Sequence, residues 1–264
     1  MSKVVLVTGA TGKQGGSVVD ALQTNYPNQF TVLAVTRDVA SSSAQKLASK
    51  PNVKLVQGNL DDEATSEPIW GVYSVQISMG KGVTYESEIA QGKALIDESV
   101  KNNVSQFVYS SVERGGDEAS WDNETPIPHF SSKHKIEHHL RDNAGGMGWT
   151  ILRPVAFMDN LAPGFPTKVF LTAVHNALGD NKSMQWIATA DIGFFAAEAF
   201  AKPDEWNHKA VGLAGDELTF PEISKSFENS TGSLADVQKL RKINPQLMTL
   251  EDWIVKKSAF PTKQ

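Results

Sequence analysis

The sequence of 264 residues contains no cysteine. This absence excludes disulfide bonds, thiolate zinc sites and cysteine nucleophiles, so any response to redox state would have to come through a bound cofactor. No apolar run approaches the length that spans a membrane, and a first strand expected from residue 4 leaves no room for a signal peptide. We therefore expect a cytoplasmic protein that does not enter membranes, with the nucleus as the alternative location.

Excess positive charge is also lacking, because the formal net charge is −5. A general affinity for nucleic acid is therefore not expected, and any role at DNA would run through a protein partner. With 40% hydrophobic and 21% charged residues, the composition is that of an ordinary folded protein. The length allows one large α/β domain or a nucleotide domain with a smaller lobe.

A glycine-rich turn follows the first apolar run, residues 4–7, and precedes an amphipathic segment. Glycines at this spacing let the chain bend sharply, let the backbone approach a pyrophosphate and let the new helix pack on the strand. The helix N-terminus then offers free N–H groups to the phosphate. A turn that only allows strand and helix to pack is the alternative. The candidate cofactor-binding residues here are Gly9, Thr11, Gly12, Lys13, Gln14 and Gly15; a surface role for Lys13 or Gln14 stays open.

A second buried strand is expected over residues 31–36, and it ends at Arg37 and Asp38. In a dinucleotide fold, an acidic residue at this place holds the ribose 2′-hydroxyl, whereas an arginine accommodates a 2′-phosphate. Arg37 lies nearest the strand end and favours NADP(H) over NAD. Asp38 would then be solvated or pair with a neighbouring cation.

Two further strands are expected over residues 53–57 and 72–78. The polar turn after the first of them lies where adenine binds in dinucleotide folds, although Asp61 also suits a helix N-cap. The second ends in a glycine-rich stretch, residues 79–82, that could pass over the cofactor. The candidate cofactor residues after these strands are Asn59, Leu60, Asp61 and Ser78.

The alternation of apolar strands with helices, such as the helix expected over residues 85–102, predicts a Rossmann-type, doubly wound parallel sheet. Further strands are expected over 106–111, 150–153 and 210–214. We predict an NADP-binding domain over residues 1–154 and a smaller mixed C-terminal lobe over 155–264, partly interleaved with the sheet. In that lobe, Asp191 suits an N-cap, Thr219 and Glu222 suit a capping box, and residues 248–254 suggest a terminal helix.

Six stretches spread over nearly the whole chain share a familiar pattern: Val7-Thr8-Gly9-Ala10-Thr11-Gly12-x-x-Gly15, Thr36-Arg37, Gly58-Asn59-Leu60-Asp61-Asp62, Phe107-Val108-Tyr109-Ser110-Ser111, His129-Phe130-x-Ser132-Lys133 and Leu152-Arg153-Pro154-x-x-Phe157-Met158-x-Asn160. Together they resemble the NmrA-like family, atypical members of the short-chain dehydrogenase superfamily. The resemblance implies NADP(H) binding. Members include reductases of phenolic, quinone and secondary-metabolite substrates, and redox-sensing regulators with little or no catalysis.

The resemblance also exposes a missing residue. In typical short-chain dehydrogenases a tyrosine moves the substrate proton, a lysine one helical turn later lowers the pKa of that tyrosine and holds the ribose, and a strand-end serine orients the carbonyl. None of the four tyrosines here has a lysine four residues later. At the matching place His129 precedes Lys133, and the serine falls at Ser110 or Ser111, with Ser110 slightly favoured.

Three interpretations of His129 and Lys133 compete. Lys133 could hold the nicotinamide ribose while His129 supplies the proton. Lys133 could instead be the sole acid and base, as in the plant phenylcoumaran and isoflavone reductases that the family resembles. In the third, Lys133 binds cofactor, His129 flanks the helix entry after Pro126-Ile127-Pro128, and no hydride moves. The third has as much weight as the other two together, because the usual proton donor is absent.

In relatives the loop after the sixth strand passes the nicotinamide, which makes Pro154, Phe157 and Asn160 candidates to line the pocket; Phe157 could instead be core. His134 and His138 have a spacing that can chelate zinc, but no third ligand stands at a suitable distance in the sequence. We therefore expect no metal, and a solvated face carrying these histidines.

The sequence thus favours an NADP(H)-binding enzyme that acts on a small aromatic or carbonyl-containing metabolite, with Lys133, His129 and Ser110 around the reacting group. The alternative is a catalytically inactive regulator that reports the NADPH/NADP⁺ ratio to a protein partner. Either a monomer or a homodimer is compatible with the sequence.

Overall fold

The structure is a computed structural model that describes residues 2–58, 68–78, 80 and 82–231, together with Lys242, Asn244, Pro245 and Met248. The chain forms two compact units. The first comprises residues 1–174 and 184–217, and the second comprises residues 175–183 and 218–264. The expected boundary at residue 154 stays a prediction. Within the described residues, no helix is long and apolar enough to cross a membrane.

A seven-stranded sheet forms the centre of the first unit, with strand order β3-β2-β1-β4-β5-β6-β9. All of its neighbouring strands run parallel. The chain leaves β1 in one direction towards β2 and β3, and returns to the other side of β1 at β4, which is the doubly wound arrangement that the sequence predicts. The strands are β1 (Lys3–Val7), β2 (Phe30–Thr36), β3 (Val53–Gln57), β4 (Gly71–Ser74), β5 (Gln106–Ser110), β6 (Gly148–Pro154) and β9 (Lys209–Leu213).

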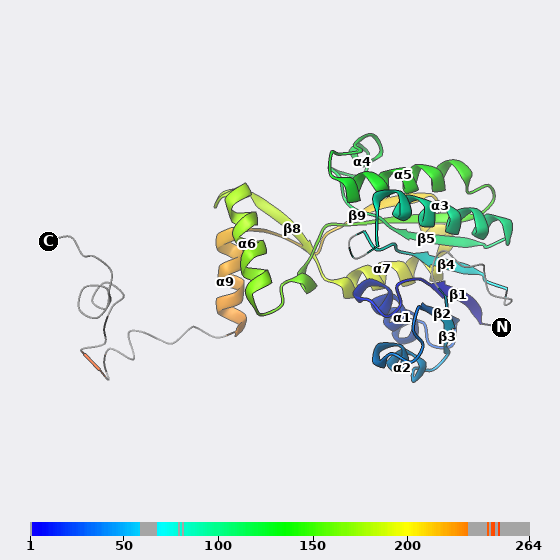
Figure 1. Cartoon of the computed structure of the whole chain (residues 1–264), viewed down its shortest axis with the longest axis horizontal. Helices are drawn as coiled ribbons and strands as arrows, with labels where there is room; N and C mark the ends of the chain where they lie inside the picture. Colours follow the sequence, from blue (N-terminus) through cyan, green and yellow to red (C-terminus); the bar gives the residue numbers. More distant parts are fainter. Residues whose placement is uncertain are drawn as a thin grey trace. The chain divides into compact units, whose positions relative to one another are not determined.

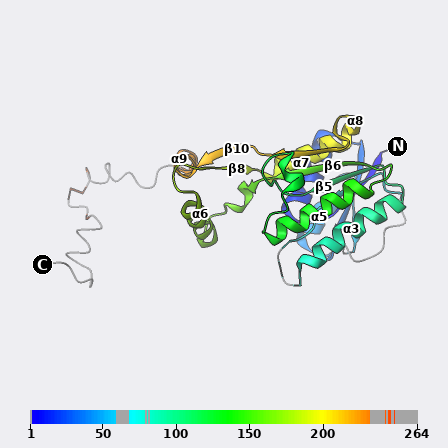
Figure 2. The same ribbon diagram turned by 90° about the horizontal axis from the view of Figure 1, so that it is seen from above.

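Helices cover both faces of this sheet (Figure 1). One face carries α1 (Lys13–Asn25), α2 (Ser42–Ala48) and α7 (Thr189–Ala201), and the other carries α3 (Tyr85–Lys101) and α5 (Pro128–Asn143). Figure 2 shows α3 and α5 side by side along the sheet. The short helices α4 (Ala119–Asp122) and α8 (Pro203–Trp206) also belong to this unit.

Alternation along the strands separates two apolar cores. Tyr73, Val108 and Leu152 pack on the α1 and α7 side, whereas their neighbours Val72 and Phe107 pack on the α3 and α5 side. Successive side chains of a strand point to opposite faces, so a strand that is buried on both faces must be apolar throughout. This is why the central strands read as unbroken apolar runs.

Helix α1 makes two unusually close approaches through glycine. A Cβ atom on Gly15 would lie 2.4 Å from the carbonyl oxygen of Gly9, and one on Gly193 of α7 would lie 2.4 Å from the carbonyl oxygen of Ser17. No real Cβ atom tolerates such distances. The absence of a side chain at both positions therefore allows α1 to pack against the first turn and against α7.

The C-terminal part of the chain contains several elements that the sequence did not predict. A second sheet has the order β10-β8-β7, and β7 pairs with β8 in parallel. In the second unit, Thr219 N–H and Oγ1 donate to Glu222 Oε2, so the predicted helix start at α9 is confirmed. That predicted helix is α9 (Phe220–Thr231), and the elements that were not predicted are β7 (Ala156–Phe157), a 3-10 turn η1 (Met158–Asn160), α6 (Phe165–Leu178), β8 (Ser183–Ile187) and β10 (Asp216–Thr219).

Two local predictions are corrected. The N-cap of α7 is Ala188 rather than Asp191, which lies in the first turn of the helix. Asp159 instead accepts hydrogen bonds from the backbone N–H and the hydroxyl of Thr189, at 2.7 and 2.6 Å. The fourth strand ends at Ser74, because residues 75–78 continue without ladder partners. The terminal helix expected over 248–254 lies outside the described residues, apart from Met248.

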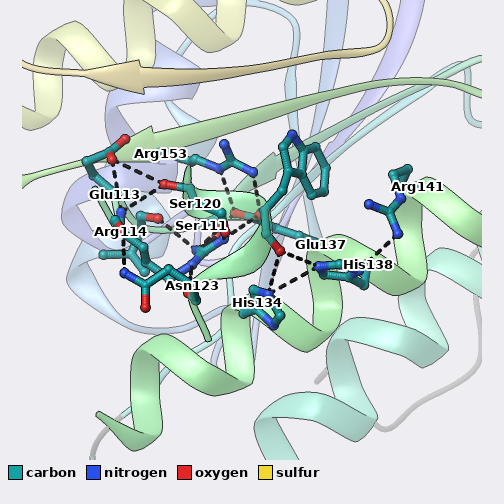
Figure 3. Close-up of polar contacts among 12 residues, drawn as sticks. Ser111, Glu113, Arg114, Ser120, Asn123, His134, Glu137, His138, Arg141 and Arg153 are labelled. Atoms are coloured by element: carbon teal, nitrogen blue, oxygen red, sulfur yellow. Dashed lines mark hydrogen bonds and ion pairs between the residues drawn. The ribbon is translucent and has the colours of Figure 1, made fainter. Parts of the chain in front are cut away.

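A buried ion cluster joins α5 to β6 and to the segment after β5 (Figure 3). Arg114 and Arg153 each donate two hydrogen bonds to the Glu137 carboxylate, at 2.7–3.2 Å, and all three side chains are fully buried. Burial raises the pKa of Glu137, but the hydrogen bonds from Arg153 and Arg114 outweigh it, so the pKa lies below its usual value. The guanidinium groups also donate to the backbone carbonyls of Asp117 and Ser120.

The histidine pair of α5 is not a solvated face. His134 Nε2 and His138 Nε2 lie 2.8 and 2.9 Å from the carbonyl oxygen of Trp121 in α4, and both rings are half-buried (Figure 3). Arg141 Nη2 donates to His138 Nδ1 at 3.0 Å, which places the His138 proton on Nε2. The two imidazoles therefore dock α4 on α5 and satisfy a helix-terminal carbonyl.

We expect Gly193→Ala to destabilise the protein although alanine favours a helix by about 1 kcal/mol. The new Cβ would meet the Ser17 backbone, and overpacking of this kind costs about 1–3 kcal/mol. Urea denaturation should show a lower free energy of unfolding. The matched control is Gly146→Ala, whose Cβ would meet nothing within 4 Å. Equal stability of both variants would contradict the close approach.

We also expect stability to fall on acidification. Burial lowers the pKa of His134 from its usual 6.5, and the nearby charges of His138 and Arg114 lower it further. The hydrogen bond with the Trp121 backbone and the charge of Glu137 raise the pKa, but the net shift is downwards. The fold thus favours the neutral ring, so the stabilisation is present above pH 6.5 and is lost as the pH falls through the lowered pKa. Denaturation curves between pH 7.5 and 5 should show this loss for the wild type and less of it for His134→Gln; equal slopes would contradict the assignment.

Candidate functional site

The glycine turn leaves the N-terminus of α1 open. Gly9 has φ of +59°, a conformation that side chains disfavour, and its carbonyl accepts the Gly12 N–H at 2.9 Å. Gly12 is the N-cap of α1, and neither a side-chain cap nor an acidic residue occupies its first turn. Free N–H groups and the positive end of the helix dipole therefore point out at the carboxyl edge of the sheet, where they suit an anion such as a pyrophosphate.

At the end of the neighbouring strand, Arg37 is exposed and makes no hydrogen bond or ion pair with the described residues. Asp38 is engaged instead, because its Oδ1 accepts the Ala40 N–H at 2.9 Å. The carboxylate that could hold a ribose hydroxyl thus supports the local turn, while the guanidinium that could hold a 2′-phosphate is available.

The first residue of α1 is tied to the loop after β7. Lys13 Nζ donates to the backbone oxygen of Asp159 at 2.6 Å and to Asn160 Oδ1 at 3.1 Å. Burial raises the pKa of Asp159, but its bonds with Thr189 and the charge of Lys13 bring it below the usual value. Lys13 and Asn160, both predicted site residues, are therefore brought together at the glycine turn.

Lys133 is buried beside a carboxylate that the sequence analysis missed. Its Nζ donates to Glu88 Oε1 at 2.8 Å, and its side chain is 11% exposed against 1% for Glu88. Glu88 also accepts from Ser78 Oγ at 2.8 Å and from Ser132 Oγ at 2.6 Å. Since an ammonium group has three donors, Lys133 retains N–H groups for a ligand beyond the one partner found among the described residues.

The serine at the end of β5 lies on the other side of the sheet. Ser110 Oγ donates to Gln14 Oε1 of α1 at 2.6 Å, whereas Lys133 and Glu88 lie on the α3 and α5 side. The following residue, Ser111, is directed to the α5 side, where it accepts from Arg114 Nη1 at 3.4 Å. Among the described residues, Ser110 and Lys133 therefore share no hydrogen-bond partner, and the assignment of Ser110 as a catalytic residue stays a prediction.

His129 lies one turn before Lys133, at the entry of α5 that Pro128 opens as expected. The ring is half-buried and packs edge-on against Phe130, with centroids 4.8 Å apart. Within the described part of the chain it makes no hydrogen bond. This geometry is compatible with each of the three interpretations of His129 given above.

No tyrosine hydroxyl contacts Lys133 among the described residues. Burial raises the pKa of Tyr109 well above its usual value, and the charges of Glu88 and Glu137 add to this effect. Tyr85 Oη is within 2.8 Å of Ser131 Oγ, and its ring lies beside Lys135 on another face of α5. The missing tyrosine is therefore not replaced by one from elsewhere in the described fold.

Of the remaining predicted site residues, Thr11 is exposed in the turn, Pro154 ends β6 and Phe157 is half-buried in β7. Asn59, Leu60 and Asp61 lie outside the described residues. Gln76, after β4, keeps a buried Oε1 with no partner in the described structure, which suits a ligand hydroxyl. No group of three or more His, Asp or Glu side chains in the described part could hold a metal ion.

Solved structures show the same fold. NmrA, described as a negative transcriptional regulator, superposes in its complex with NADP with a TM-score of 0.67 at 19% identity, covering 88% of this chain and 72% of that chain. NmrA in complex with NAD gives the same TM-score, identity and coverage. The UDP-N-acetylglucosamine 4-epimerase from Bacillus cereus gives a TM-score of 0.62 at 19% identity, with 92% of each chain covered.

Sequence relatives are named as oxidoreductases. The NmrA-like family domain-containing oxidoreductase hkm9 of Aspergillus hancockii is 28% identical over 258 residues, covering 90% of this chain and 76% of the relative. The similarly named FrzB of a Cladobotryum species is 27% identical over 259 residues, covering 88% and 74%.

The family model described as NmrA-like matches residues 1–250. This match covers the glycine turn, the exposed Arg37 and the buried Lys133 alike, and it confirms the resemblance that the sequence motifs indicate. The chain therefore belongs to the NmrA-like family.

Proposed function

We propose that this protein binds NADP(H) and acts as an oxidoreductase on a small aromatic or carbonyl-containing metabolite. The observation that carries the proposal is the uncapped, glycine-lined N-terminus of α1, directly after the central strand β1. Ligands of doubly wound folds bind at this edge, where the strand order reverses. The names of the relatives support an oxidoreductase, and the NADP and NAD complexes of NmrA support a nicotinamide dinucleotide.

Each end of the cofactor has a matching residue. Arg37, beyond β2, would pair with a 2′-phosphate, and the N–H groups of Lys13 and Gln14 would hold the pyrophosphate. The other end would extend past β4 towards Lys133, whose remaining N–H groups suit ribose hydroxyls. Gln76 Oε1, after β4, would accept from a hydroxyl.

The bound cofactor would supply a hydride. Lys133 would orient the ribose and the substrate oxygen, and either Lys133 or His129 would deliver the proton, since no tyrosine is at hand. Phe157 and Asn160 would line the substrate side of the pocket. This arrangement suits reduction of a polarised carbonyl or a conjugated ring.

We expect Arg37→Ala to weaken the binding of NADPH but not that of NADH. A hydrogen-bonded charge pair contributes about 1.5–3 kcal/mol, so the affinity for NADPH should fall by roughly 10- to 100-fold while that for NADH stays unchanged. Isothermal titration calorimetry of both dinucleotides measures this. Arg141→Ala, an exposed arginine paired with Asp142, is the matched control and should change neither affinity. Absence of dinucleotide binding by the wild type would contradict the proposed function.

A second candidate is a regulator that reports cofactor binding to a protein partner. The observation in its favour is the tie from Lys13 to Asp159 and Asn160, because a pyrophosphate at the same ammonium would compete with that tie. Cofactor binding would then release the loop after β7. This device needs no hydride transfer and is compatible with the absent tyrosine.

Turnover decides between the two candidates. The enzyme should oxidise NADPH with some member of a panel of quinones, enones and aromatic ketones, and Lys133→Met should reduce kcat by about 10²-fold or more because it removes an orienting and proton-transferring group. The regulator should show no turnover with any of them, but a clear difference in affinity between NADPH and NADP⁺. Full activity in Lys133→Met would refute the catalytic assignment.

A further inference from the structure

Glu88 is a buried carboxylate of α3 held by three donors from two other parts of the fold. Lys133 and Ser132 come from α5, Ser78 follows β4, and Glu88 itself lies in the first turn of α3. All three bonds measure 2.6–2.8 Å. The carboxylate and the ammonium group of Lys133 therefore form a fixed pair with no net charge.

The charge of this pair matters if the nicotinamide lies beside it. The nicotinamide ring carries one positive charge when oxidised and none when reduced, whereas the rest of the cofactor is the same. A neutral pair adds little preference for either form. An uncompensated Lys133 would repel only the oxidised ring.

We propose that Glu88 is a positioning residue that balances the charge of Lys133 and thereby sets the relative affinity for oxidised and reduced cofactor. The inference rests on the proposed function, in which Lys133 holds the nicotinamide ribose. Two unit charges about 10 Å apart at an effective dielectric constant of about 20 change an equilibrium by roughly tenfold. The effect acts on one redox state, so it differs from a loss of fold or of general affinity.

The experiment measures Kd for NADP⁺ and for NADPH by isothermal titration calorimetry in the full chain. In Glu88→Gln, the ratio of Kd for NADP⁺ to Kd for NADPH should rise roughly tenfold, because a single positive charge remains. In the double variant Glu88→Gln/Lys133→Met both charges are gone, and the ratio should return to the wild-type value. Glu88→Asp keeps the charge and should keep the ratio even if both affinities fall.

Glu137→Gln is the matched control, since Glu137 is the other buried carboxylate held by cations beside α5. It should lower the melting temperature without moving the ratio. An unchanged ratio in Glu88→Gln, or an equal change in Glu137→Gln, would overturn the inference. If the wild type bound neither dinucleotide, the proposed function itself would fail, which is a different result.

Discussion

The close approach of α1 to its surroundings is the constraint on which the rest of the structure depends. Gly15 lets the helix start directly on the turn after β1, and Gly193 lets α7 pack against Ser17, near the start of the same helix. The apolar core on the α1 and α7 face of the sheet then closes. The same packing leaves the first turn of α1 uncapped at the carboxyl edge, so one steric condition serves both stability and binding.

Two buried carboxylates beside the sheet differ in how completely their cationic partners are hydrogen-bonded within the described structure. Glu137 meets two arginines in bidentate pairs, and further guanidinium N–H groups donate to the backbone carbonyls of Ser120 and Asp117. Glu88 meets one lysine and two hydroxyls, and the lysine retains donors that the described residues do not fill. A fully satisfied cluster stabilises, whereas an ammonium with spare donors is prepared for a ligand.

Much of the fold could be predicted from patterns of residues that are close in sequence. The apolar runs, the glycine spacing and the Pro128 helix entry depend on residues near one another in sequence, and the sheet order and α5 confirm them. Asp191 failed as an N-cap because Asp159, 30 residues from Thr189, reaches that helix start instead. Glu88 was missed because nothing in its own helix distinguishes a buried carboxylate from an exposed one; only Lys133, 45 residues away, does.

The sequence by itself determined the family, the doubly wound fold and the residue types at the candidate dinucleotide site, because strand periodicity, turn chemistry and motif spacing are local properties. Only the tertiary structure decided which side chains are committed and which are available. It engages Asp38, leaves Arg37 exposed and without a partner among the described residues, turns Ser110 towards Gln14, and pairs Lys133 with Glu88. These outcomes depend on which faces of distant elements meet, and that is set by packing across the sheet rather than by spacing along the chain.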